Sequence, residues 1–128
     1  MKETKRKIAW GITGAGDLIN ETLEAMKWLK ETYEGSVEIE VYLSKAGEQV
    51  LRFYKLGDEL RGSFHQVQVE RDANTPFITG RLQLGLFDFL LIAPSTSNTV
   101  AKIAHGISDT MLTNGAIQAL KASVPVYV

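Results

Sequence analysis

Two stretches of this chain are apolar at nearly every position, whereas two others alternate between apolar and polar residues. The continuous runs occupy residues 8–12 and 88–93, and such runs are typical of parallel strands buried on both faces. Residues 37–43 and 66–70 alternate, which predicts strands with one wetter side. The second of these is short, so we expect it at an edge of the sheet. Residues 124–128 predict a fifth strand.

Apolar residues recur at helical spacing between the predicted strands. The first such segment runs from Ile19 to Tyr33, and Gly35 follows it in the place of a C-cap. Gly106 disfavours one continuous helix near the end of the chain, so two helices are expected there, with a break before Ser108. The predicted helices cover residues 19–33, 50–60, 77–84, 100–107 and 111–121.

Strands that alternate with helices predict a parallel sheet with helices on both faces. The two continuous apolar strands belong at the centre of this sheet, which favours the strand order 3-2-1-4-5. We therefore predict an α/β fold with a three-layer, doubly wound parallel sheet, Rossmann-like or flavodoxin-like, in which residues 1–128 form a single domain. Ligands bind such sheets at the carboxyl ends of the strands where the strand order reverses. Here that switch point lies between the first and fourth strands.

Composition narrows the classes of function. The chain has 128 residues, a net charge of −1 and no cysteine, which argues against nucleic-acid partners, anionic-membrane partners, disulfides and thiol chemistry. No run approaches the roughly 18 apolar residues of a membrane span, and the basic N-terminus lacks a signal-peptide core. We expect a soluble protein of the cytoplasm.

The loop after the first strand, residues 13–17, is rich in glycine. Gly14 and Gly16 match the dinucleotide-binding fingerprint only loosely, so phosphate binding and ordinary turn chemistry both fit this loop. After the second strand, Ser44 and Lys45 stand where a dinucleotide site would have an acid for the ribose. A hydroxyl beside a cation suits a phosphate, which favours a mononucleotide ligand.

The loop after the fourth strand begins with Pro94 and continues with five hydroxyl or amide side chains, residues 95–99. One N-cap needs one such side chain, and Thr96 or Ser97 could supply it. The surplus favours hydrogen bonding to a polar ligand at a helix N-terminus.

We assign no catalytic or ligand-binding role to the histidines and tryptophans. We interpret His65 as a solvated side chain and His105 as a structural or interfacial one. Trp10 and Trp28 are expected in the core. No His, Asp or Glu grouping has the spacing of metal ligands, and no Ser–His–Asp arrangement can be argued.

Three motifs resemble the FMN-binding flavoprotein family, which includes cysteine-type decarboxylases and flavin prenyltransferases. They are the turn Gly11–Ala15, Ser44 after the second strand, and the run Ala93–Ala104, which contains Pro-Ser-Thr-Ser-Asn-Thr. Within the family, the chain looks most like archaeal flavoproteins related to dihydromethanopterin reductase. That narrower resemblance rests on residues 8–16, 43–50 and 74–77.

The resemblance implies FMN as the cofactor. The glycine-rich loop would approach FMN through backbone groups, Ser44 would bind the phosphate with Lys45 nearby, and the later loop would contact the flavin and its ribityl-phosphate tail. Asn98 is the single residue we most expect to touch the flavin. The implied cofactor-binding residues are Thr13, Gly14, Ala15, Gly16, Ser44, Lys45, Pro94, Thr96, Ser97, Asn98 and Thr99. The resemblance also implies a homotrimer or an assembly of trimers, with FMN near the subunit contacts.

Two departures from the family pattern shape the expected function. The decarboxylases have a His just after the third strand, where this chain has no His in residues 74–77, and the prenyltransferases have a Lys where Asn98 stands. We therefore expect an FMN-dependent electron-transfer flavoprotein or oxidoreductase, with no catalytic side chain assigned. Electrons would pass from a carrier such as ferredoxin, or another iron–sulfur protein, to a protein or pterin acceptor.

Two alternatives remain open at this point. One is an FMN-dependent decarboxylase or transferase for a cysteine-type substrate, and the other is a non-catalytic FMN-binding module. Family members usually continue past the last predicted strand, and this chain ends at Val128 on an apolar run. We accordingly expect either further residues, which would carry substrate or partner contacts, or a partner subunit that covers this end.

Overall fold

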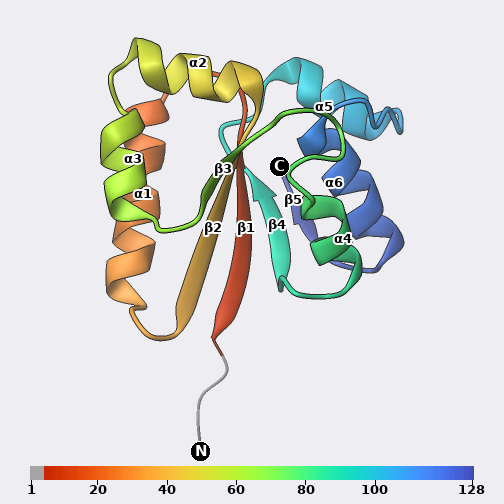
Figure 1. The fold of residues 1–128 in the computed structure, drawn as a ribbon, viewed down its shortest axis with the longest axis horizontal. Helices are drawn as coiled ribbons and strands as arrows, with labels where there is room; N and C mark the ends of the chain where they lie inside the picture. The colour runs from red at the N-terminus through yellow and green to blue at the C-terminus, as the bar shows by residue number, and fades with distance from the viewer. Residues whose placement is uncertain (1–4) are drawn as a thin grey trace, which may run out of the picture.

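In the computed structural model, which describes residues 5–128, five parallel strands lie between two layers of helices (Figure 1). The sheet has the order β3-β2-β1-β4-β5, so the predicted topology and its switch point between β1 and β4 are confirmed. The short β3 lies at an edge, as its alternating pattern predicts. The strands are β1 (Arg6–Ile12), β2 (Val37–Leu43), β3 (Val67–Val69), β4 (Phe89–Ile92) and β5 (Val126–Tyr127).

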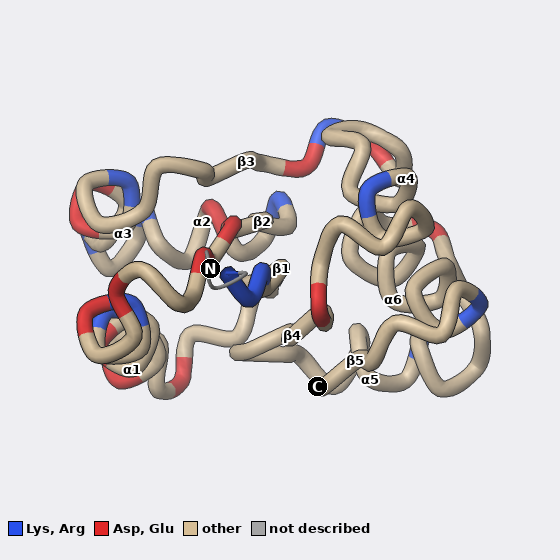
Figure 2. Tube along the Cα trace, turned by 90° about the horizontal axis from the view of Figure 1, so that it is seen from below, with Lys and Arg blue, Asp and Glu red and all other residues tan. Residues whose placement is uncertain are grey.

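Helices cover the sheet on both sides, as Figure 1 and the view from below in Figure 2 show. One layer contains α1 (Ile19–Thr32), α2 (Lys45–Phe53) and α3 (Gly57–Ser63). The other contains α4 (Ile78–Gln83), α5 (Ser97–Ala104) and α6 (Met111–Lys121). Acidic and basic residues occur together in α1, α2 and α3, whereas α4, α5 and α6 each carry one basic residue and no acidic one (Figure 2).

The strand β1 contributes side chains to two hydrophobic cores, one on each face of the sheet. Ile8, Trp10 and Ile12 pack with α1, α2 and α3, whereas Ala9 packs with α4 and α6. All four side chains are buried, which explains why β1 has no polar alternation. Gly11 lies on the second face, where an added Cβ would stand 2.7 Å from a methyl carbon of Leu112, so α6 packs closely against the centre of the sheet.

Several boundaries differ from the sequence-based expectations. The helix expected over 50–60 is two helices, because the backbone turns into the left-handed region at Lys55 (φ 58°). The helix α1 is capped by Tyr33, and Gly35 adopts its positive φ of 85° two residues later. The fifth strand is two residues long rather than five. The expectation for Trp28 was wrong: its side chain is 58% exposed and meets Tyr33 edge-on at the surface.

Two kinds of feature are absent from the described residues. Among residues 5–128, no helix combines the length and the apolar character needed to cross a membrane. The same part of the chain contains no group of three or more His, Cys, Asp or Glu residues arranged to hold a metal ion.

Candidate functional site

The two loops at the switch point are tied together by Thr13. Its backbone N–H donates to the carbonyl oxygen of Pro94 at 3.1 Å, and its hydroxyl donates to the same oxygen at 2.8 Å. The hydroxyl also accepts a hydrogen bond from the backbone N–H of Thr96 at 2.9 Å. Because Thr13 is only 3% exposed, these bonds form inside the protein and fix the position of one loop relative to the other.

Three helices begin beside these loops, each with a hydroxyl N-cap. Ser44 accepts from the backbone N–H of Gly47 at 2.9 Å, Thr96 from that of Thr99 at 3.1 Å, and Thr110 from that of Thr113 at 3.2 Å. All three capping residues line one cleft. The N-terminal end of a helix carries partial positive charge, so three such ends favour an anion at this place.

This cleft has a volume of about 510 Å³ and collects seven of the eleven cofactor-binding residues expected from the sequence. Those seven are Thr13, Gly14, Ser44, Lys45, Thr96, Asn98 and Thr99. Sequence reasoning missed the other residues that line it, which are Ala46, Glu70, Asp109, Thr110 and Leu112.

Four expected residues lie outside the cleft. Pro94 does not line the cleft, but its carbonyl oxygen accepts the two hydrogen bonds from Thr13, which does. Gly16 lines a neighbouring cavity, whereas Ala15 and Ser97 line neither of the two spaces.

The neighbouring cavity is more apolar and has a volume of about 470 Å³. Its lining residues are Gly14, Gly16, Ala46, Gln49, Val50, Phe53 and Tyr54. A Cβ on Gly14 would lie 2.7 Å from the Cβ of Ala46, and one on Gly16 would lie 3.1 Å from the Tyr54 ring. Glycine at both positions therefore keeps the loop close to α2 and leaves the surface between the two spaces free of side chains.

Several backbone donors in the polar cleft are free to bind a ligand. Within residues 5–128, the N–H groups of Gly14, Ala46, Asn98 and Leu112 donate no hydrogen bond to another part of the chain. They come from the glycine-rich loop and from the first turns of α2, α5 and α6. Donors at helix starts are the groups that proteins use to hold phosphates.

Charged side chains surround this set of donors. Lys45 contributes an exposed ammonium group, and Lys102 pairs with Asp109 at 3.0 and 3.1 Å. The carboxylate of Glu70 accepts hydrogen bonds from the backbone N–H of Lys45 at 3.2 Å and of Met111 at 3.0 Å. Glu70 directly follows β3, and attention to every residue at the carboxyl ends of the strands would have found it from the sequence.

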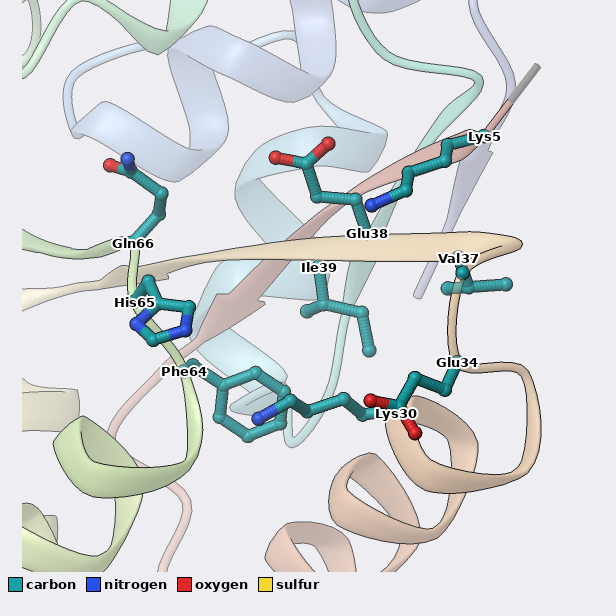
Figure 3. A pocket seen from close by; sticks show the side chains of 10 residues that line it. Lys5, Lys30, Glu34, Val37, Glu38, Ile39, Phe64, His65 and Gln66 are labelled. Atoms are coloured by element: carbon teal, nitrogen blue, oxygen red, sulfur yellow. The ribbon is translucent and has the colours of Figure 1, made fainter. Parts of the chain in front are cut away.

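A separate cavity of about 260 Å³ lies at the amino ends of β1 and β2 (Figure 3). One of its charged groups is already engaged, because the Lys30 ammonium donates to the carbonyl oxygen of Ser63 and lies 5.5 Å from the centre of the Phe64 ring. His65 borders this cavity and is exposed, as predicted, and His105 is exposed after α5. Neither histidine of the described chain lines the polar cleft.

Comparison with known proteins connects this geometry to a family. The family model described as Flavoprotein matches residues 1–128. An uncharacterized protein of Methanocaldococcus jannaschii is 51% identical over 122 residues, which are 95% of this chain and 64% of that protein. A dihydromethanopterin reductase (acceptor) of the same organism is 42% identical over 125 residues, which are 92% of this chain and 50% of that protein. The chain thus spans between half and two thirds of the length of these relatives.

A solved structure extends the comparison to a ligand. DmrB of Burkholderia xenovorans, in complex with FMN and described as a cubic protein cage for redox transfer, superposes with a TM-score of 0.81 and 36% identity. The match covers 95% of this chain and 63% of that protein. The paired loops and the polar cleft thus occur in a chain that is similar along nearly its whole length to an FMN-bound protein.

Proposed function

This chain belongs to the Flavoprotein family, and on that premise we propose that it is an FMN-binding electron-transfer flavoprotein or oxidoreductase. One observation carries the proposal. The cleft gathers Ser44, Lys45, Thr96 and the starts of three helices at the switch point of a chain that is 36% identical to an FMN-bound protein.

The residues present fit the phosphate of FMN. A phosphate carries close to two negative charges at neutral pH and accepts several hydrogen bonds. The ammonium of Lys45 and the unused N–H groups of Gly14, Ala46 and Asn98 offer the matching charge and donors. Ser44 holds the first turn of α2 through its bond to Gly47, so we assign it to shaping the phosphate site as well as touching the ligand.

The residues of the adjoining cavity suit the flavin ring. Gly14 and Ala46 border both spaces, and Val50, Phe53 and Tyr54 give the second space an apolar, aromatic lining. Bound FMN would supply one- and two-electron redox chemistry, and the protein would bind it, orient it and set its electrostatic surroundings. Asn98 is exposed and its side-chain amide has no hydrogen-bond partner in the described chain, so it remains our choice for a flavin contact.

Electron donors and acceptors are proposed from the resemblance. The relative described as a dihydromethanopterin reductase (acceptor) supports a pterin or protein acceptor, and we propose ferredoxin or another iron–sulfur protein as the donor. The cage described for DmrB supports a homo-oligomer, which we propose is a trimer or an assembly of trimers. The cytoplasmic location stays a prediction from the sequence.

A decarboxylase function has less support. The cysteine-type decarboxylases need a histidine near the cofactor as a general acid or base, and neither histidine of the described residues borders the cleft. Release of carbon dioxide from peptidyl- or pantothenoyl-cysteine would favour that function over electron transfer.

The test of the proposal is spectroscopic. We expect the purified protein to show flavin absorbance, or to acquire it when FMN is added, and the released cofactor to have the mass of FMN. Anaerobic mixing with reduced ferredoxin is then expected to bleach the flavin band. A protein that neither contains nor takes up FMN would overturn the proposal, and bound FMN that no donor reduces would favour a non-catalytic binding module.

A further inference from the structure

Glu70 connects the two helical layers across the carboxyl ends of the strands. Its backbone N–H donates to the carbonyl oxygen of Leu43 at 2.9 Å, which anchors it beside the end of β2. One carboxylate oxygen accepts from the N–H of Lys45 at 3.2 Å, and the other accepts from the N–H of Met111 at 3.0 Å. Lys45 begins α2 and Met111 begins α6, and these helices lie on opposite faces of the sheet.

The carboxylate occupies positions that a ligand anion would otherwise take. Lys45 and Met111 are the first residues of their helices, so their N–H groups have no acceptor within the helix. Glu70 satisfies both with a charge-assisted hydrogen bond. The next N–H groups, those of Ala46 and Leu112, donate to nothing else in the described chain and line the same cleft. Glu70 thereby determines which donors of α2 and α6 are left for a ligand.

From this arrangement we propose that Glu70 is a positioning residue for the phosphate of the bound nucleotide. The inference rests on the proposed function. Glu70 does not touch the phosphate, because two anions repel each other. It holds the first turn of α2 in place so that Ser44, Lys45 and Ala46 present their donors to a single phosphate group. Loss of Glu70 should therefore lower the affinity only for ligands that carry that phosphate.

The test compares FMN with riboflavin, which is the same flavin without the phosphate. Glu70→Gln keeps the size of the side chain but turns one acceptor into an NH₂ donor, which cannot accept from a helix N–H. We expect the variant to bind FMN at least tenfold more weakly than the wild type and to bind riboflavin within twofold of it. Glu48→Gln is the matched control, because Glu48 lies in the first turn of α2, which Glu70 contacts, but its carboxylate pairs with Arg52 at 3.2 Å and Arg61 at 3.4 Å. The control is expected to bind FMN within twofold of the wild type.

A second pair of variants tests the hydrogen bond between the Lys45 N–H and Glu70 by changing the donor residue. Proline is well accepted at the first position of a helix and has no N–H, and Ser44 already has the extended backbone that precedes proline (φ −66°, ψ 164°). Lys45→Pro and Lys45→Ala both lose the ammonium group, and only the proline also loses the donor to Glu70. We expect Lys45→Pro to bind FMN more weakly than Lys45→Ala, with the same affinity for riboflavin.

Each outcome decides between Glu70 as a phosphate-positioning residue and another role. Unchanged or increased FMN affinity in Glu70→Gln would overturn the inference. An increase would indicate that the Glu70 carboxylate merely repels the phosphate. Parallel losses for FMN and riboflavin would make Glu70 a general structural residue. If Glu70→Gln does not fold, the proline–alanine pair decides, and equal FMN binding by those two variants overturns the inference. Failure of the wild type to bind FMN would instead refute the proposed function.

Discussion

The hydroxyl oxygen of Thr13 accepts a hydrogen bond from the backbone N–H of Thr96 at 2.9 Å, across 83 positions of sequence. The same hydroxyl donates to the carbonyl oxygen of Pro94 at 2.8 Å. One buried side chain therefore joins the turn after β1 to the loop after β4. This bond sets the spacing of the two walls of the cleft independently of any ligand.

Thr13→Val removes this connection while keeping the shape of the side chain. The N–H of Thr96 loses its acceptor in a partly buried place, so we expect the free energy of unfolding to fall by about 1–3 kcal/mol. Urea denaturation measures the change. Thr32→Val, at the exposed end of α1, is the control and is expected to stay within about 0.5 kcal/mol of the wild type. A loss for Thr13→Val no larger than that of the control would contradict the structural role of the bond.

Ser44→Ala and Asn98→Ala are expected to separate folding from binding. Ser44 caps α2, so its loss is expected to lower stability by about 1 kcal/mol and to weaken FMN binding. Asn98 is exposed, and we expect its replacement to weaken FMN binding with a stability change below about 0.5 kcal/mol. Thermal unfolding and FMN titration give the two quantities, with Ser36→Ala at the amino end of β2 as the control. Unchanged FMN affinity in both variants would show that the assigned residues do not hold the cofactor.

Lys55→Gly is expected to stabilise the protein. Lys55 has a φ of 58°, and the N–H of Leu56 closes the end of α2 by donating to the carbonyl oxygen of Leu51 at 2.8 Å. Glycine adopts this backbone without the left-handed strain, so a gain of about 1 kcal/mol is expected. Lys121→Gly makes the same exchange inside the last turn of α6, where we expect a loss of up to about 1 kcal/mol. Chemical denaturation of both variants checks the opposite signs, and equal signs would count against the explanation.

Tyr42 is expected to make stability depend on alkaline pH. Burial, followed by the negative charge of Glu40, raises the pKa of the Tyr42 phenol above its ordinary value of about 10. The unfolded chain therefore loses this proton first, and stability falls as pH rises past about 10. For one proton, the loss of unfolding free energy is expected to be at most about 1.4 kcal/mol per pH unit.

The measurement compares unfolding free energies between pH 9 and pH 11. In Tyr42→Phe the slope is expected to be shallower than in the wild type, although the variant starts lower because it loses hydrogen bonds to Glu40 at 3.1 Å and from Arg81 at 2.9 Å. Tyr33→Phe is the control, since Tyr33 is exposed and takes no part in the hydrogen bonds among Tyr42, Glu40 and Arg81. Identical slopes for the wild type and Tyr42→Phe would show that the phenol does not contribute.

The sequence was most informative where burial alone decides structure. The apolar runs 8–12 and 88–93 could be recognised because strands covered on both faces leave no room for polar residues, and they fixed the switch point. The cleft followed from the same rule, since it lies where the loops after those strands meet. That these residues bind FMN stays a prediction until the titrations above are made.

Other features depended on contacts that a one-dimensional pattern does not contain. The first turn of α2, residues 45–48, contains no large apolar residue, so the apolar spacing began only at Val50, whereas the helix begins directly after its N-cap Ser44. Trp28 was expected in the core, yet the buried stripe of α1 runs through Ile19, Leu23 and Met26. The role of Glu70 arises from two helix starts that are far apart in sequence and meet it in space.

The close approach of Gly14 to Ala46 limits how the site can change over generations. With 2.7 Å between a hypothetical Cβ at position 14 and the existing one at position 46, there is room for one methyl group but not for two. Position 14 already carries the smallest residue, so it cannot compensate for a larger side chain at position 46. A lineage that keeps this loop and a side chain at position 46 is therefore confined to glycine at position 14, and variation in what the protein binds must arise elsewhere around the cleft.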